Sequence, residues 1–159
     1  MRFKCFYFGL LFFSLGIQAE QIQAKNFSLH DIQNNRVITL NDYHGKVIYL
    51  DFWASWCSSC AKALPLFKKW HQELGDDFVV VSVNVDEDKA DGLLMAQKFQ
   101  LDFPIGYDEN LDVAKMYGAS VLPFSFIINQ DGDIHYRHVG FQDTDAVKLK
   151  TIIQKLLSK

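Results

Sequence analysis

Two cysteines separated by two residues, Cys57 and Cys60, are the side chains of this sequence best suited to covalent chemistry. They lie where a long apolar run gives way to residues with helical spacing. The first cysteine would then stand at a helix N-terminus, where free amide hydrogens and the macrodipole favour a thiolate. We therefore expect Cys57 to attack a disulfide and Cys60, one turn into the helix and more shielded, to resolve the mixed disulfide.

Other uses of the cysteine pair fit the sequence less well. Haem attachment requires a histidine directly after the second cysteine, and Ala61 stands there. A zinc site would need two more ligands, but His135 and His138 lie three apart on an expected strand and should point to opposite faces. An inert structural disulfide stays open, although so short a loop constrains the unfolded chain little.

A second candidate for chemistry is Asp51, a carboxylate inside an otherwise apolar run. Burial of an acid is costly unless the group is paired or protonated, and it raises the pKa toward the range useful for proton transfer. The alternative is an acid at the strand end that reaches solvent or pairs with a lysine.

These residues must be positioned by strands that alternate with helices. Apolar runs and turn signals predict strands, and recurrences at three and four residues predict helices. The expected strands are 36–40, Val47–Trp53, Phe78–Val85, Phe124–Asn129 and Ile134–Val139. The expected helices are Cys60–Leu74, Ala90–Phe99, Leu111–Tyr117 and a last one capped by Asp143 or Thr144. The pattern predicts one α/β domain with a mixed central sheet and flanking helices.

Length and charge narrow the class of protein further. The chain has 159 residues, 49% of them apolar, which suits one domain with its own core. A net charge of -3 without a cluster of basic residues argues against nucleic-acid binding. Three cysteines are too few for a disulfide-framework miniprotein.

The first 19 residues have the layout of a secretory signal peptide. Arg2 and Lys4 precede a run of large apolar residues, and Gln18-Ala19 leads into polar sequence. We expect cleavage after Ala19, because the run is too short to span a membrane; an uncleaved anchor is the alternative. Residues 20–159 would then form the mature domain, with net charge -5 and with Cys57 and Cys60 as its only thiols in an oxidising compartment.

The segment from Leu50 to Cys60 resembles the active-site signature of thioredoxin-fold proteins, and the chain is most similar to their exported TlpA/ResA-like branch of thiol-disulfide oxidoreductases. Further likeness lies in Phe27-Ser28-Leu29, in Gly45-Lys46 and in an insertion between Asp86 and Tyr117. The resemblance implies a thioredoxin fold with an added N-terminal β-hairpin and a central helical insertion.

The same resemblance implies roles for particular residues. Asp51 would take the proton of Cys60, and a cis-proline facing the cysteines maps onto Pro123. Leu122 would pair through its backbone with substrate, and Trp56 would be an exposed aromatic that contacts partners. Trp53, Phe124 and Phe126 are expected in the core. The chain departs from the pattern at Ala63, where a glutamate is common, and the neutral Ser58-Ser59 leaves the redox potential open.

We therefore expect an exported thiol-disulfide oxidoreductase that cycles between dithiol and Cys57-Cys60 disulfide without metal or other cofactor. The family suggests reduction of exported protein disulfides, with apocytochrome c as one possible class of substrate, and recharging by a thiol-disulfide electron donor in the membrane. An oxidase or isomerase would run the same chemistry in reverse. A non-enzymatic metal-binding or chaperone-like module is the third alternative. A peroxiredoxin would want threonine at the position of Ala54.

Overall fold

A computed structural model describes residues 21–158, and the expected signal peptide at 1–19 lies outside these residues. The strands are β1 (Ser28–Asp31), β2 (Val37–Thr39), β3 (Val47–Trp53), β4 (Phe78–Asn84), β5 (Ile105–Tyr107), β6 (Phe124–Ile128) and β7 (Ile134–Val139). The α-helices are α1 (Ser58–Glu73), α2 (Lys89–Lys98), α3 (Asp112–Tyr117) and α4 (Asp145–Leu157), and a short 3-10 helix η1 spans Leu40–Tyr43.

The strands form one mixed sheet in the order β2-β1-β5-β4-β3-β6-β7. Strand β3, in the interior of the sheet, pairs in parallel with β4 and antiparallel with β6. Every residue of β3 and β4 is buried, because helices cover both faces of the sheet, and this explains their nearly continuous apolar sequence. The expected α/β fold with a mixed central sheet is confirmed.

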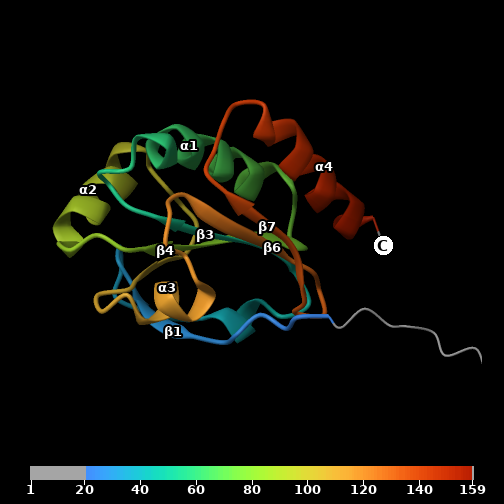
Figure 1. Ribbon diagram of the computed structural model, residues 1–159, viewed down its shortest axis with the longest axis horizontal. Helices are drawn as coiled ribbons and strands as arrows, with labels where there is room; N and C mark the ends of the chain where they lie inside the picture. Colours follow the sequence, from blue (N-terminus) through green and yellow to red (C-terminus); the bar gives the residue numbers. More distant parts are fainter. Residues whose placement is uncertain (1–20, 159) are drawn as a thin grey trace, which may run out of the picture.

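Alternating residues of β3 point into two different cores. Helices α1, α2 and α4 cover one face, while α3 and η1 lie on the other (Figure 1). Tyr49 and Trp53 pack on the α1 face, in the same cluster as both cysteines. Leu50 and Phe52 pack on the α3 face. The face of the sheet below α1 is therefore the face that meets the cysteine pair.

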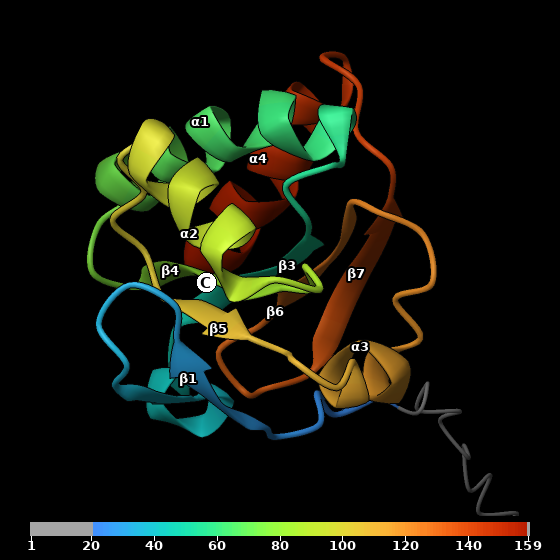
Figure 2. The same ribbon diagram turned by 90° about the vertical axis from the view of Figure 1, so that its left-hand side faces the viewer.

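The N-terminal hairpin and the central insertion are joined to each other. Strands β1 and β2 form the expected antiparallel hairpin, and β1 also pairs with β5. Strand β5 lies inside the insertion and pairs in parallel with β4 (Figure 2). The sequence reading missed β5, since three residues after Phe103-Pro104 are too short for an alternating pattern to be recognised.

The other expected elements are present with ends shifted by at most two residues, and two details of their ends are informative. The expected strand at 36–40 is shorter, because Leu40 opens the helix η1. Thr144 occupies the N-cap position of α4, but no side-chain cap bond forms there. Instead the Asp145 carboxylate accepts a hydrogen bond from the backbone N–H of Gln142, at 2.8 Å. The predicted N-cap position at Thr144 is therefore confirmed, but the expected side-chain capping bond is absent.

Candidate active site

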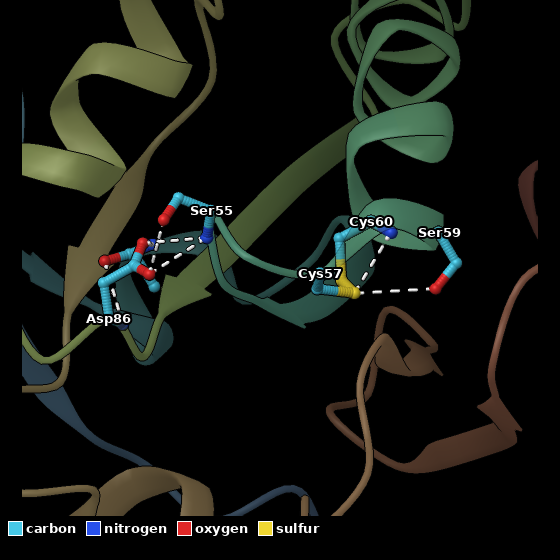
Figure 3. Close-up of a disulfide and its surroundings, with 6 residues drawn as sticks. Ser55, Cys57, Ser59, Cys60 and Asp86 are labelled. Carbon is cyan, nitrogen blue, oxygen red and sulfur yellow. Dashed lines mark hydrogen bonds between the residues drawn. A yellow bond between two sulfur atoms is a disulfide. The ribbon is translucent and has the colours of Figure 1, made fainter.

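The two cysteines form a disulfide at the start of helix α1 (Figure 3). The S–S distance is 2.04 Å and the Cα atoms are 5.2 Å apart. Cys57 is the N-cap residue, and its Sγ accepts a hydrogen bond from the backbone N–H of Cys60 at 3.2 Å. Cys57 is 7% exposed and Cys60 1%. Cys57 thus has an amide donor of the kind that favours a thiolate and is the more exposed of the two cysteines, whereas Cys60 is almost completely shielded.

A serine hydroxyl within the motif also reaches the attacking sulfur. Ser59 Oγ lies 3.5 Å from Cys57 Sγ, while Ser58 is exposed. Because the sulfur of a thiolate is a better acceptor than that of a disulfide, this hydroxyl can donate to Cys57 after reduction. The Ser58-Ser59 dipeptide carries no charge, and its sequence gave no indication of the redox potential. One of its two serines, Ser59, nevertheless contacts Cys57 Sγ.

The loop before Cys57 is held by the buried carboxylate of Asp86, just past the end of β4. It accepts hydrogen bonds from the backbone N–H of Ser55 at 2.9 and 3.0 Å and from the Ser55 hydroxyl at 2.8 Å (Figure 3). The amide of Asn84 donates to the same carboxylate at 2.7 Å. Since Ser55 is two residues before Cys57, these bonds fix the path of the chain into the cysteine motif.

Helix α2 packs tightly on Asn84. A Cβ atom added at Gly92 would lie 2.5 Å from Asn84 Oδ1, closer than side chains tolerate. Gly92 thus allows α2 to approach β4 while Asn84 keeps its contact with Asp86. The central insertion is in this way connected to the loop that precedes the cysteines.

Asp51 lies in the middle of β3 and is 1% exposed. It has the same orientation as Tyr49 and Trp53, two residues to either side, and so faces the cluster that contains the cysteines. Neither carboxylate oxygen has a hydrogen-bond partner, and no ion pair reaches it among the described residues. Desolvation raises the pKa of Asp51 well above its usual range. The alternative of a solvent-exposed or lysine-paired acid is therefore wrong.

Two expected substrate contacts line an apolar groove. Trp56 is 71% exposed, and it forms one wall of a groove of about 500 Å³ together with Leu122. Most of the other lining residues belong to α3 and its flanking turns. The Leu122-Pro123 peptide bond is cis, as expected. By contrast, Trp53, Phe124 and Phe126 are buried core residues, also as expected.

The described residues do not offer a metal site. No group of three histidine, cysteine or acidic residues within 21–158 is arranged to hold a metal ion. Exposure alternates along β7, so that His135 faces outward and His138 inward, as predicted. In the same part of the chain no helix is long and apolar enough to cross a membrane.

Sequence reasoning did not identify Ser55, Asp86 or Ser59 as parts of the site. Asp86 served only to mark the start of the insertion. Its position two residues after the buried strand β4 and its short polar side chain were signals of a loop anchor, but they could not show which backbone it holds.

A disulfide at the start of a helix that packs on a mixed sheet, in a chain that also has a cis-proline before strand β6, defines a thioredoxin-fold protein with a dithiol-disulfide site. The chain belongs to the redoxin family, whose profile matches residues 19–153. The suspected membership of the thioredoxin superfamily is confirmed.

Similar proteins are named as thiol-disulfide oxidoreductases. The thiol-disulfide oxidoreductase ResA of Bacillus thuringiensis is 30% identical over 127 residues, which cover 79% of this chain and 73% of that protein. ResA of Bacillus subtilis is 33% identical over 117 residues, covering 73% and 65%. A crystal structure from Chlorobium tepidum, assigned as the thiol:disulfide interchange protein DsbE, has a TM-score of 0.82 at 31% identity and covers 87% and 98% of the two chains. Together with the cysteine pair, these relatives identify the chain as a thiol-disulfide oxidoreductase.

Proposed function

We propose that this protein is an exported reductase of protein disulfides that works through a Cys57/Cys60 dithiol-disulfide cycle. The observation that supports it most directly is the geometry at the start of α1. There the more accessible sulfur accepts an amide hydrogen bond, and the shielded cysteine faces the same core as the unpaired acid Asp51.

The reaction follows from these positions. The Cys57 thiolate attacks one sulfur of a substrate disulfide, a mixed disulfide forms, and the other substrate sulfur leaves as a thiolate. Asp51 takes the proton of the Cys60 thiol, and the Cys60 thiolate attacks Cys57 Sγ. The second substrate sulfur leaves as a thiolate. Two electrons have then passed from the cysteine pair to the substrate, and the protein ends as the Cys57-Cys60 disulfide.

The surface beside the cysteines suits an extended protein substrate. The exposed Trp56 directly precedes Cys57 in the chain, and Leu122, which precedes the cis-proline, lines the same apolar groove. We assign Trp56, Leu122 and Pro123 to substrate binding. A chain segment with an apolar side chain near its cysteine would place that side chain in the groove and its disulfide over Cys57.

The cellular setting completes the proposal. Residues 1–19 are proposed to act as a removed signal peptide and residues 20–159 as the exported, periplasmic or otherwise extracytoplasmic domain, since the start of the sequence has that layout. Substrates would be exported proteins, with apocytochrome c thiols as one candidate, and a membrane thiol-disulfide donor would return the electrons.

The proposal is tested by trapping. Cys60→Ala removes the resolving thiol, so covalent complexes through Cys57 should accumulate in cells that export the protein, and mass spectrometry would name the substrates. Cys57→Ala is the matched control, because it keeps one cysteine but lacks the attacking one. Equal amounts of complex in both variants, or none in either, would contradict the mechanism.

The direction of electron flow is tested separately by equilibration with glutathione. A reductase should have a reduction potential well below about -200 mV, near the range of thioredoxin. A potential well above that value would instead make the protein an oxidase or isomerase of exported proteins.

A further inference from the structure

A row of polar side chains crosses the apolar sheet at the level of Asp51. The strand register pairs Asp51 of β3 with Ser125 of β6, and Ser125 with His138 of β7. Residues paired in register have their side chains on the same face, with Cβ atoms about 5 Å apart. The row therefore runs below α1 and α4 from the buried acid to β7, the edge strand of the sheet (Figure 1).

Unsatisfied atoms flank the middle of this row. Among residues 21–158, the buried side-chain nitrogen and oxygen atoms without a hydrogen-bond partner are the two carboxylate oxygens of Asp51 and Nε2 of His138. Both residues are register neighbours of Ser125. Buried polar atoms are nearly always satisfied, so their concentration on either side of one hydroxyl indicates a function.

The hydroxyl group of Ser125 can donate a hydrogen bond. Its Oγ accepts a hydrogen bond from the Tyr49 hydroxyl at 2.9 Å, which occupies one lone pair and fixes the oxygen in the row. The bonds found for Ser125 within the described chain leave its own hydrogen free to turn toward Asp51 or toward His138.

At the β7 end of the row, His138 lies beside the carboxylate of Asp145, and both side chains are partly exposed to solvent. His138 Nε2 lies 3.3 Å from Asp145 Oδ2, within ion-pair distance although not aligned for a hydrogen bond. The side chain of His138 is 15% exposed and that of Asp145 27%. A proton that arrives on His138 would thus be stabilised by a carboxylate and could leave to water.

We propose that Ser125 and His138 form the path by which Asp51 exchanges its proton with solvent between turnovers. Protonated Asp51 gives its proton to Ser125 Oγ while the hydroxyl proton of Ser125 passes to His138 Nε2. The imidazolium next to Asp145 then releases a proton to water, and no electrons move. The path rests on the proposed role of Asp51, and it explains how an acid with so little exposure can act repeatedly.

Other titratable groups face the row and must be considered in any pH profile. They are Tyr49 on β3, Tyr136 on β7, Asp145 and Lys148 on α4, and the two cysteines of α1. Of the residues in the row, His138 is the one that stands between Ser125 and solvent. The path is therefore expected to be most sensitive to substitution of His138.

A pH-jump experiment on the oxidised protein tests the path without any substrate. The infrared carbonyl band of protonated Asp51, identified by its loss in Asp51→Asn, is followed after a rapid rise in pH. We expect the band to disappear about tenfold more slowly in Ser125→Ala and in His138→Gln than in the unsubstituted protein. His135→Gln, on the same strand but on the outer face, is the matched control and should match the unsubstituted protein.

The outcomes are distinct. An equilibrium titration of the same carbonyl band gives the midpoint pH of Asp51 in each variant. Rates are then compared at final pH values equally far above each midpoint, so that a changed pKa is not mistaken for a changed rate. Rates within about twofold of the unsubstituted protein in both variants would overturn the path. If Ser125→Ala does not fold, His138→Gln decides alone. Loss of the path would leave the reductase proposal intact, because trapping by Cys60→Ala does not depend on it.

Discussion

Two buried aspartates lie near the cysteines, and their surroundings are opposite. Asp86, at the end of β4, accepts hydrogen bonds from the backbone and hydroxyl of Ser55 and from Asn84. Asp51, in the middle of β3, accepts none. Their exposed fractions are nearly the same, 2% and 1%.

Burial alone therefore does not reveal what an acid does. A carboxylate that accepts several hydrogen bonds holds its donors in place, so Asp86 is suited to positioning the loop before Cys57. A carboxylate without partners is easily protonated, so Asp51 is suited to storing and releasing a proton. The following substitutions test this division, in order of decreasing effect.

Removal of the paired acid should have the largest effect on stability. Asp86→Ala leaves the Ser55 amide and the Asn84 side chain without their acceptor, and we expect the free energy of unfolding to fall by about 3 kcal/mol. Denaturant unfolding of the oxidised protein measures it. Ser55→Ala, which removes only the hydroxyl bond, should cost about 1 kcal/mol. If the Asp86→Ala protein were as stable as the unsubstituted protein, Asp86 would not hold the loop, and the contrast with Asp51 would fail.

Removal of the unpaired acid should affect the chemistry instead. Asp51→Asn cannot accept the Cys60 proton, so the second step should slow about tenfold at neutral pH while attack by Cys57 is unchanged. Reaction of the reduced protein with DTNB separates the two steps, because each releases one nitrothiobenzoate. Slowing of the first phase instead of the second would contradict the assignment of Asp51 to Cys60.

The same substitution should raise stability at neutral pH. Burial raises the pKa of Asp51, so the folded state keeps a proton that the unfolded chain loses above about pH 4. Stability therefore falls as pH rises from there through the folded-state pKa. Asp51→Asn removes this loss, and we expect its unfolding midpoint to be higher by about 4 °C at pH 7 but not below pH 4. Thermal unfolding of both oxidised proteins is measured across this pH range. If their unfolding midpoints changed with pH in the same way, the prediction would be wrong.

The smallest effect is expected inside the cysteine motif. Ser59→Ala removes a donor to the reduced Cys57 sulfur and should make the reduction potential more negative by about 20 mV. Ser58→Ala, one residue away and exposed, is the control and should leave the potential unchanged. A similar shift in both variants would mean that helix propensity, and not the hydrogen bond, is responsible.

Much of this arrangement could be predicted from the sequence. The apolar run around Asp51 identified β3, and the cysteine spacing identified the start of α1, because both signals are local in the chain. The exposure of Trp56 and the cis bond before Pro123 followed from the resemblance to a family. The opposite orientations of His135 and His138 followed from strand geometry.

The polar partners could not be predicted in the same way. Asp86 and Ser55 are 31 residues apart, and Tyr49 and Ser125 are 76 apart. Such contacts depend on which strands pair and in which register, which the amino-acid pattern of one strand does not specify. The short β5 was missed for a related reason, since its three residues are held by neighbours on both sides.

The glycine on α2 gives the insertion a consequence for protein engineering. A side chain at position 92 would displace Asn84 and so disturb its contact with Asp86. Because Asp86 also holds Ser55, a change on α2 would reach the loop two residues before Cys57. An insertion taken from a relative would therefore keep the loop before Cys57 in place only if it had a glycine where Gly92 packs on Asn84. The segment between β4 and β6 cannot be exchanged as an independent module, and chimeras should be designed with both sides of this contact taken from one parent.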